Sequence, residues 1–255
     1  MDRELSFAHS NVNNLPNSDL LILPIGSIER HGDHLPLGTD TIIAEYVSQR
    51  VALKLRNEGY KVFVLPPIWY GYTWSLLHLD GTITIEPSVL KSFIEDILVS
   101  LANPRFTRIL IINGHGGNKE PIELAVKEAL LRLGPGIKIG YISWWDVLDE
   151  ETLDRALPGS KPLHACEIET SIMLYICPSC VDKEALNRVE PVRPPRRSIL
   201  RSLEDTRKAF SKGYLGDPKK ANEEAGKVII ESVIDKLVDL IKRELTKEKV
   251  ELEYE

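Results

Sequence analysis

Apolar residues along the chain form short continuous runs that alternate with longer segments of helical periodicity. Four runs have the pattern of buried strands, at residues 19–26, 60–68, 107–114 and 137–145. Apolar residues at helical spacing predict helices over residues 39–55, 87–101, 119–133, 167–176 and 219–245. This alternation predicts an α/β fold in which a mainly parallel central sheet has helices on both faces.

One stretch departs from the alternation. NRVEPVRPPRRSILRS, residues 187–202, is rich in proline and arginine. We expect it to be an irregular surface segment or a subunit contact, not a domain boundary. The sequence has no internal repeat or low-complexity tract, so residues 1–255 are expected to form a single α/β domain.

Composition and charge narrow the class of protein. With 43% hydrophobic and 27% charged residues, the chain has the composition of an ordinary globular protein. A net charge of −6 gives no electrostatic reason to bind nucleic acid or an anionic membrane. No segment is apolar for long enough to span a bilayer, and the N-terminus lacks the apolar core of a signal peptide. We therefore expect a cytoplasmic protein.

Three cysteines are too few for a disulfide framework. Cys177 and Cys180 form a CPSC pair, which could be half of a zinc site, a redox pair or a local disulfide. No second pair accompanies them, so ordinary packing is the favoured interpretation. Cys166, two residues after His164, is better explained as a small buried thiol than as a nucleophile.

The polar clusters of the chain follow the predicted strands. GSIERHGDH, with Glu29 and His31, comes after the first strand, and NGHGGN, with His115, ends the third. The fourth strand ends in WWD, with Trp144 and Trp145. Ligands bind outside the carboxyl ends of the strands in open parallel sheets, so these side chains are expected to converge on one edge.

Imidazoles and carboxylates in one place, without thiolates, are typical of a zinc, manganese or iron site. The carboxylates that accompany the histidines are Glu29, Asp40, Glu167 and Glu169. Asp40 could bridge two cations through its two oxygens, as two-metal hydrolytic sites require. Taken singly, Asp40 could be only a helix cap and Glu169 an exposed helix acid. A metal site is favoured because such residues follow three separate strands, which is improbable by chance.

Other catalytic plans fit the sequence less well. The chain has no G-x-S-x-G elbow, which counts against the serine nucleophile of an α/β-hydrolase. NGHGGN is not a dinucleotide-binding G-x-G-x-x-G motif, and no P-loop sequence is present. Metal-dependent hydrolysis remains the best-supported chemistry.

Three motifs, GSIERHGDHLPLGTD, NGHGGN and HACEIETS, resemble those of the creatininase (creatinine amidohydrolase) family in order and spacing. The likeness also includes HLDGTITI, SWWDV and GYLGDPKKANEEAGK. The resemblance implies a three-layer α/β/α sandwich, two divalent metal ions per subunit and hydrolysis of a non-peptide, often cyclic, amide C–N bond. It also implies a homo-oligomer, commonly a hexamer.

The same resemblance assigns roles to individual residues. Glu29, Asp40 and His115 would bind one cation, and His31 would join Asp40 at the second, with Asp40 bridging the two. His164 matches the histidine proposed to shuttle protons in creatininase.

One departure from the family pattern concerns the second cation. Creatininase has a metal-binding glutamate two residues after the histidine of NGH, whereas this chain has Gly117, which cannot be a ligand. This chain instead has Glu167, three residues after His164, where creatininase has an apolar residue. We expect Glu167 to supply the missing ligand.

The expected substrate is a small-molecule amide. Trp145 matches a tryptophan that helps to enclose the substrate and would form a flat apolar wall. Trp144 is expected in the core, because adjacent strand residues point to opposite faces. His78, in LLHLDGT, is either part of the substrate wall or a loop histidine bonded to backbone.

The expected reaction is attack on the amide carbon by a water that two cations acidify, with His164 delivering a proton to the departing nitrogen. HGGN with HA-x-E is also typical of relatives that act on formamidopyrimidines or modified peptides. A deformylase or peptidase is therefore an alternative, and so is an inactive oligomeric binding protein. The ligand types do not distinguish zinc, manganese and iron.

Overall fold

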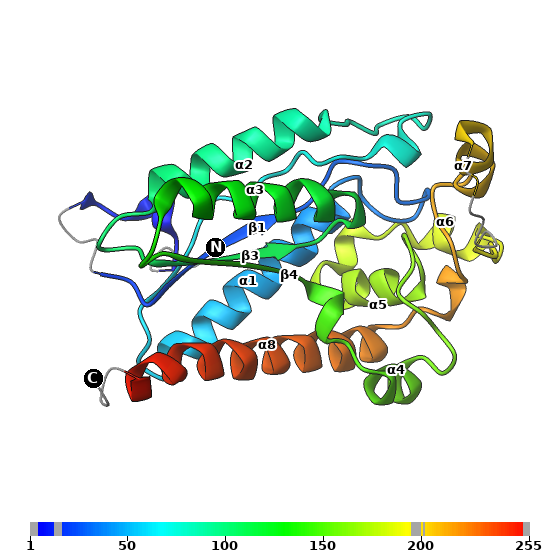
Figure 1. Ribbon diagram of the computed structural model, residues 1–255. Coiled ribbons are helices and arrows are strands. Elements are labelled where there is room, and N and C mark those ends of the chain that lie inside the picture. Colours follow the sequence, from blue (N-terminus) through cyan, green and yellow to red (C-terminus); the bar gives the residue numbers. More distant parts are fainter. Residues whose placement is uncertain (1–4, 13–16, 195–199, 201, 252–255) are drawn as a thin grey trace.

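The structure is a computed structural model that describes residues 5–12, 17–194, 200 and 202–251. Its sheet contains four parallel strands in the order β2-β1-β3-β4, of which Figure 1 labels β1, β3 and β4. They are β1 (Leu20–Ile25), β2 (Val62–Val64), β3 (Arg108–Asn113) and β4 (Lys138–Ser143). The predicted parallel sheet is confirmed, with each strand inside the run that predicts it.

Strand β1 lies inside the sheet, and all six of its residues are buried. Its side chains alternate between the two faces, as strand geometry requires. Leu20 and Ile22 pack into the core on one face, and Leu21 and Leu23 pack into the core on the other. A continuous apolar run is therefore what this position demands.

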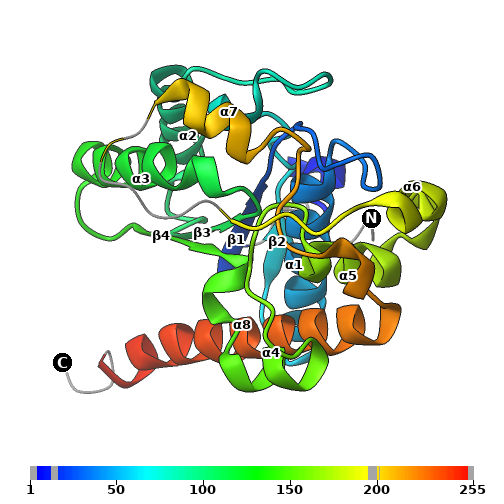
Figure 2. The ribbon, with the colours of Figure 1, turned by 90° about the vertical axis from the view of Figure 1, so that its right-hand side faces the viewer.

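Helices cover both faces of the sheet. Helices α1 (Thr39–Asn57), α5 (Glu167–Ile176) and α8 (Glu223–Glu251) pack on one face, and α2 (Pro87–Leu101) and α3 (Lys119–Leu133) pack on the other. Figure 2, turned by 90°, shows α2 and α3 on the opposite side of the sheet from α8. The three shorter helices are α4 (Glu150–Ala156), α6 (Lys183–Arg188) and α7 (Leu203–Ala209). The predicted three-layer α/β/α sandwich is confirmed.

The last helix begins later than its apolar spacing predicts. Residues Pro218–Lys220 form a separate 3-10 turn, and α8 starts at Glu223. Asn222 caps the helix, because its side-chain oxygen accepts a hydrogen bond of 2.9 Å from the backbone N–H of Ala225. The predicted start at residue 219 is therefore wrong.

Two sequence-based predictions concern the segment after α5: the state of Cys177 and Cys180, and the irregular stretch at 187–202. Cys177 and Cys180 form a disulfide bond directly after this helix, so the expectation of ordinary packing is wrong. The irregular stretch predicted at 187–202 is wrong at its start, because residues 187 and 188 belong to α6; residues 189–194 contain no helix, and residues 195–199 and 201 lie outside the described part of the chain. Within the described ranges, no helix combines the length and apolar character needed to cross a bilayer.

The order of the strands reverses direction between β1 and β3. The chain leaves β1 for β2 on one side, and it leaves β3 for β4 on the other. Ligands bind at such a reversal, outside the carboxyl ends of the strands. At this point Gly114 follows β3 past the first turn of α1, where a Cβ would lie 2.2 Å from the carbonyl oxygen of Asp40. Only glycine permits this close approach.

Candidate metal centre

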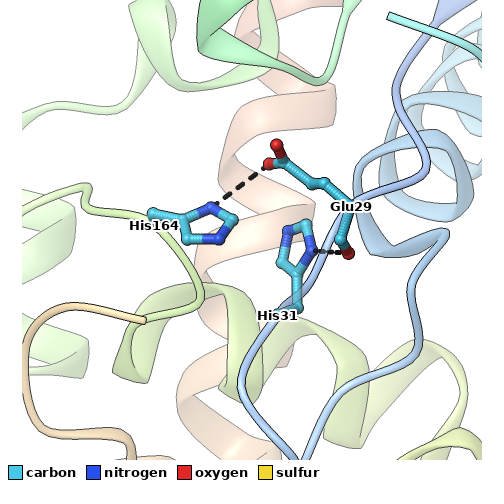
Figure 3. Close-up of side chains that lie close together, drawn as sticks. All are labelled: Glu29, His31 and His164. Carbon is cyan, nitrogen blue, oxygen red and sulfur yellow. Dashed lines mark hydrogen bonds and ion pairs between the residues drawn. The ribbon is translucent and has the colours of Figure 1, made fainter. Parts of the chain in front are cut away.

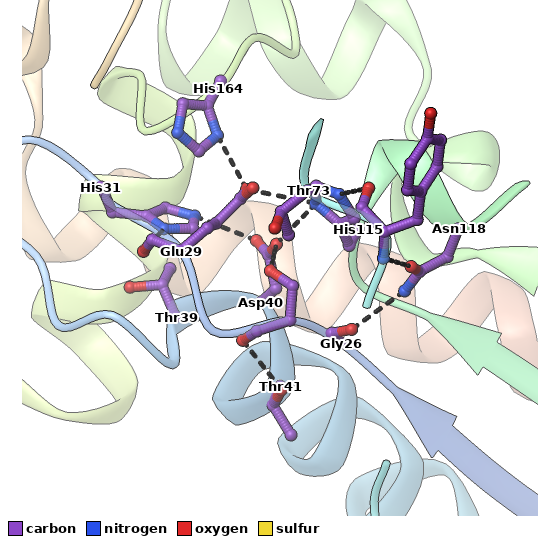
Figure 4. A network of polar contacts seen from close by, with 12 residues as sticks. Gly26, Glu29, His31, Thr39, Asp40, Thr41, Thr73, His115, Asn118 and His164 are labelled. Carbon is purple, nitrogen blue, oxygen red and sulfur yellow. Dashed lines mark hydrogen bonds and ion pairs between the residues drawn. The ribbon is translucent and has the colours of Figure 1, made fainter. Parts of the chain in front are cut away.

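Asp40 lies at the centre of a buried polar cluster at this edge of the sheet (Figure 4). Its Oδ1 is 3.0 Å from Nε2 of His31, and its Oδ2 is 2.9 Å from Nδ1 of His115. The hydroxyl of Ser27 also donates to Oδ2, at 2.7 Å. Gly38, not Asp40, occupies the cap position of α1. The carboxylate therefore faces the cluster with both oxygens.

Glu29 is fully buried, yet the structure gives neither of its carboxylate oxygens a hydrogen bond. Its Oε1 lies 3.1 Å from Nδ1 of His115 and 3.3 Å from Nδ1 of His164, as Figure 3 shows for His164. A buried carboxylate that lacks hydrogen bonds costs free energy. The imidazole contacts offset part of this cost, and a bound cation would offset more of it.

The described residues contain three sets of side chains whose ligand atoms all lie within 4.8 Å of one another. The sets are Glu29, Asp40 and His115; His31, Asp40 and Glu169; and Glu29, His31 and His164. Asp40 belongs to two of the sets, and its two oxygens face a different imidazole in each. This is the arrangement expected of a carboxylate that bridges two cations.

The charges of the cluster favour cations. Burial alone would lower the pKa of His31, but the carboxylates of Asp40 and Glu29 raise it to about 10. The pKa of His115 is likewise raised above its ordinary value, against burial, by Glu29 and Asp40. Burial raises the pKa of Glu169 to about 8. In the absence of metal the cluster retains protons, which binding of a cation would displace.

The two ring nitrogens of His164 have different surroundings. Its Nε2 is 2.8 Å from the carbonyl oxygen of Arg30, so this nitrogen carries the hydrogen and donates it. Nδ1 then presents a lone pair toward Glu29 and the cluster (Figure 3). Burial lowers the pKa of His164, which favours the neutral imidazole at neutral pH.

Glu169 connects the cluster to the turn that carries His164. Its Oε2 accepts a hydrogen bond of 2.5 Å from the backbone N–H of Ala165. Ala165 has φ +47, and among the described residues it is the only one other than glycine with a positive φ. Such backbone costs free energy and persists only where its surroundings hold it in place. Glu169 is one of the groups that hold it.

The structure does not bring Glu167 into the cluster. Its carboxylate instead accepts a hydrogen bond of 2.8 Å from the backbone N–H of Asp217, and it belongs to none of the three ligand sets. Position 117 also has no room for an acid, because a Cβ on Gly117 would lie 2.1 Å from the carbonyl oxygen of Tyr72. The acid that reaches the cluster from α5 is Glu169.

A cavity of about 440 Å³ contains the cluster and is lined in part by Trp145, Leu163 and Phe210. Trp145 thus lies where a substrate wall is predicted, and Trp144 is buried as expected. Both belong to a 3-10 helix after β4, Trp144–Val147, and not to the strand itself. Strand alternation is therefore not the reason for their different environments.

His78 lies away from this cavity. It lines a separate cavity of about 520 Å³, together with Arg30 and Lys212. The structure therefore does not join His78 to the cluster as a substrate wall. Cys166 is buried, and burial raises the pKa of its thiol to about 12, which agrees with a packing role.

Sequence reasoning missed two side chains around the cluster, Ser27 and Lys119, and did not choose a third, Glu169, as a ligand. Ser27 is a small polar residue after β1, and nothing in its spacing marks it as a partner of Asp40. Lys119 lines the cavity, but its position directly after NGHGGN suggests only a helix start. Glu169 is a candidate ligand by sequence, but the sequence-based prediction for the second cation is Glu167. The HACEIET motif contains both acids and does not show which of them faces His31.

Comparison with known proteins places the chain among related sequences. The sequence model of the family Creatininase, described as creatinine amidohydrolase, matches residues 8–241. Creatinine amidohydrolase of Pseudomonas putida is 28% identical, over 88% of this chain and 89% of the relative. Mycofactocin precursor peptide peptidase of Mycobacterium tuberculosis is 33% identical, over 89% of this chain and 86% of the relative. The 2-amino-5-formylamino-6-ribosylaminopyrimidin-4(3H)-one 5'-monophosphate deformylase of Methanocaldococcus infernus is 27% identical, over 86% and 89%.

Solved structures agree with these matches. A structure described as manganese creatininase is 25% identical, with a TM-score of 0.82 over 95% of this chain and 99% of that one. A creatininase variant described as Zn-Zn type is 28% identical, with a TM-score of 0.80 over 89% and 90%.

Proposed function

The chain belongs to the creatininase family and is a hydrolase, and we propose that it cleaves a non-peptide amide C–N bond in a small, often cyclic substrate. The observation that carries the proposal is the buried Glu29 carboxylate without hydrogen bonds. It lies next to Asp40, whose two oxygens face two sets of ligand atoms. A hydrolytic two-metal site accounts for both features.

Two divalent cations fit these residues. Glu29, Asp40 and His115 would hold the first. His31 and Glu169 would hold the second together with Asp40. Oxygen and imidazole donors suit zinc and manganese, the metals named for the two solved relatives, and they also suit iron.

When bound, the cations would polarise the substrate carbonyl and lower the pKa of a nearby water. His164 accepts a proton from the attacking water at Nδ1 and gives it to the departing nitrogen. The Arg30 carbonyl, by accepting from Nε2, keeps the proton-accepting nitrogen directed at the cluster. Trp145 provides a flat wall for a planar substrate.

The sequence analysis leaves two alternative functions, a deformylase or peptidase and an inactive binding protein, which the substrate screen below distinguishes. Relatives named as a peptide peptidase and a deformylase make modified peptides and formamides candidate substrates. An inactive binding protein is disfavoured, because His164 and a full set of ligand residues are present. The homohexamer stays a prediction from the family.

The test is a substrate screen with defined metals. The chelated protein is reloaded with zinc, manganese or ferrous iron and assayed on cyclic amides, formamidopyrimidines and short modified peptides. Turnover that disappears on chelation and returns with metal supports the proposal. Activity that survives complete metal removal would refute it.

A matched pair of variants tests the second cation site. Glu169→Gln is expected to reduce bound metal from two cations to one per chain, whereas Glu167→Gln is expected to retain both, because Glu167 bonds Asp217 instead. Metal analysis of the purified proteins measures this directly. Loss of metal from Glu167→Gln alone would instead support Glu167, the residue predicted from the sequence, as the ligand of the second cation.

A further inference from the structure

Lys119 provides a positive charge in the cavity that holds the metal cluster. Among the described residues that line this cavity, Lys119 is the only lysine or arginine. It is the first residue of α3 and follows His115 by four positions, so the connection that places the His115 imidazole also places this ammonium. Its side chain is 40% exposed, which leaves it accessible to a ligand.

The position of the Lys119 ammonium is fixed by two neighbours. Nζ lies 3.1 Å from Oδ1 of Asp146 and 5.3 Å from the centre of the Trp145 ring. Asp146 is itself held, because its Oδ2 accepts a hydrogen bond of 3.0 Å from the backbone N–H of Ser143. The ammonium has three donors, and Asp146 is its hydrogen-bond partner among the described residues. It can therefore donate to a ligand without leaving Asp146.

The charge expected for the metal-loaded site also favours an anionic ligand. Three carboxylates, those of Glu29, Asp40 and Glu169, would face two divalent cations, which gives a formal charge of about +1 for the centre. With Lys119 beside it, the cavity has no excess of negative charge to repel an anion. Trp145 lies under the ammonium and also lines the cavity, so a planar group held beside Lys119 would pack against its indole.

We propose that the substrate is a planar amide that carries an anionic group, a carboxylate, which Lys119 binds while the amide lies at the metal centre. This inference rests on the proposed function and specifies its substrate class. It assigns Lys119 a role in specificity that is separate from the chemistry at His164. An uncharged cyclic amide would lack the contact with Lys119.

Binding of two hydroxamates tests the inference without requiring turnover. Benzohydroxamate and its para-carboxy derivative present the same metal-chelating group, and only the second carries an anion. Calorimetry on the metal-loaded protein gives both dissociation constants. We expect the carboxylate to improve affinity by about fivefold, as for a partly exposed ion pair. Lys119→Met should abolish this preference, and Lys119→Arg should retain it.

Lys127→Met is the matched control. Lys127 is also on α3, but it pairs with Glu123 and does not line the cavity, so the preference should persist in this variant. An equal preference for the carboxylate in wild type and Lys119→Met would overturn the role of Lys119, and so would no preference in wild type. Metal analysis of the same preparation separates the two proposals: absence of bound cations refutes the two-metal site, whereas bound cations with no binding of either hydroxamate overturn the inference alone.

Discussion

Acidic side chains gather at two places in this molecule, and their charges are balanced in different ways. Between α2 and α3, Glu95 lies 3.0 Å from the ammonium of Lys91 and 2.7 Å from the guanidinium of Arg132. At the edge of the sheet, Glu29 and Asp40 lie beside imidazoles, with no lysine or arginine in contact among the described residues. Lysine and arginine balance the first group, whereas the second is balanced by protons on its imidazoles, which a metal ion would displace.

The difference follows from where the residues come from in the chain. Lys91 and Glu95 are one helical turn apart, so the local geometry of α2 already pairs them. Glu29 and His115 come from the loops after β1 and β3, and Asp40 comes from the first turn of α1, so the three meet only when the sheet forms. Ion pairs of the first kind stabilise a helix pair. A buried cluster of acids and imidazoles with strongly shifted pKa values is costly to fold and is a better indicator of function than the number of charges.

The largest expected effect is the loss of activity in His164→Asn, which removes the proposed proton carrier and leaves the acidic cluster intact. Loss of general acid–base catalysis should lower kcat by about a hundredfold to ten-thousandfold. Bound metal should stay at the wild-type level if His31, Asp40 and Glu169 complete the second site without His164. Steady-state kinetics and metal analysis on the same preparation measure both. Loss of a cation from this variant would instead make His164 a ligand, as the third set of ligand atoms allows.

The next effect concerns stability with and without metal. At a free metal concentration of about one hundred times Kd, a site that binds only the folded state adds about 2.7 kcal/mol to the free energy of unfolding. Asp40→Asn should remove this increment, because Asp40 is shared by two ligand sets. Glu95→Gln should retain it while lowering the baseline. Urea unfolding of each variant with metal and with chelator provides the measurement, and a retained increment in Asp40→Asn contradicts the bridging role.

The smallest effect is expected from pH at the paired cluster. Arg132 and Lys91 hold the pKa of Glu95 at about 2, below its ordinary value of 4.5. A depressed folded pKa means that the stabilisation is present above pH 4.5 and is lost as pH falls from 4.5 to 2. Glu95→Gln should therefore lose less stability over this interval than wild type. Glu184→Gln, which alters an exposed pair with Arg188, serves as the control and should follow wild type.

Much of the fold could be predicted because its signals are local. The runs behind β1 and β3 are largely continuous apolar segments, as inner strands of a parallel sheet require, and the run behind the edge strand β4 is still apolar enough to be recognised. The start of α8 could not be predicted from spacing, because Pro218 and the cap at Asn222 override the apolar period. The pairing of Cys177 with Cys180 was an open alternative, since proximity in sequence does not distinguish a bond from packing.

The positions of site residues could be predicted where they follow the end of a strand. They could be predicted less well where they depend on which face of a helix points to the site. Glu29 and His115 follow neighbouring strands, so the parallel sheet itself brings them together. Glu167 and Glu169 are two positions apart on α5 and therefore point in different directions. One bonds the backbone of Asp217, and the other faces His31. Such a choice depends on how the helix is rotated in the folded chain.

The bond between Glu169 and the backbone of Ala165 has a consequence for metal substitution. A larger or smaller cation at the second site would draw the Glu169 carboxylate to a different distance, and the left-handed turn that bears His164 would have to follow. Exchange of one metal for another would then alter proton delivery through a displacement of the main chain, in addition to any change in Lewis acidity. Enzyme forms that differ only in the ion they carry would differ in the pH profile of kcat.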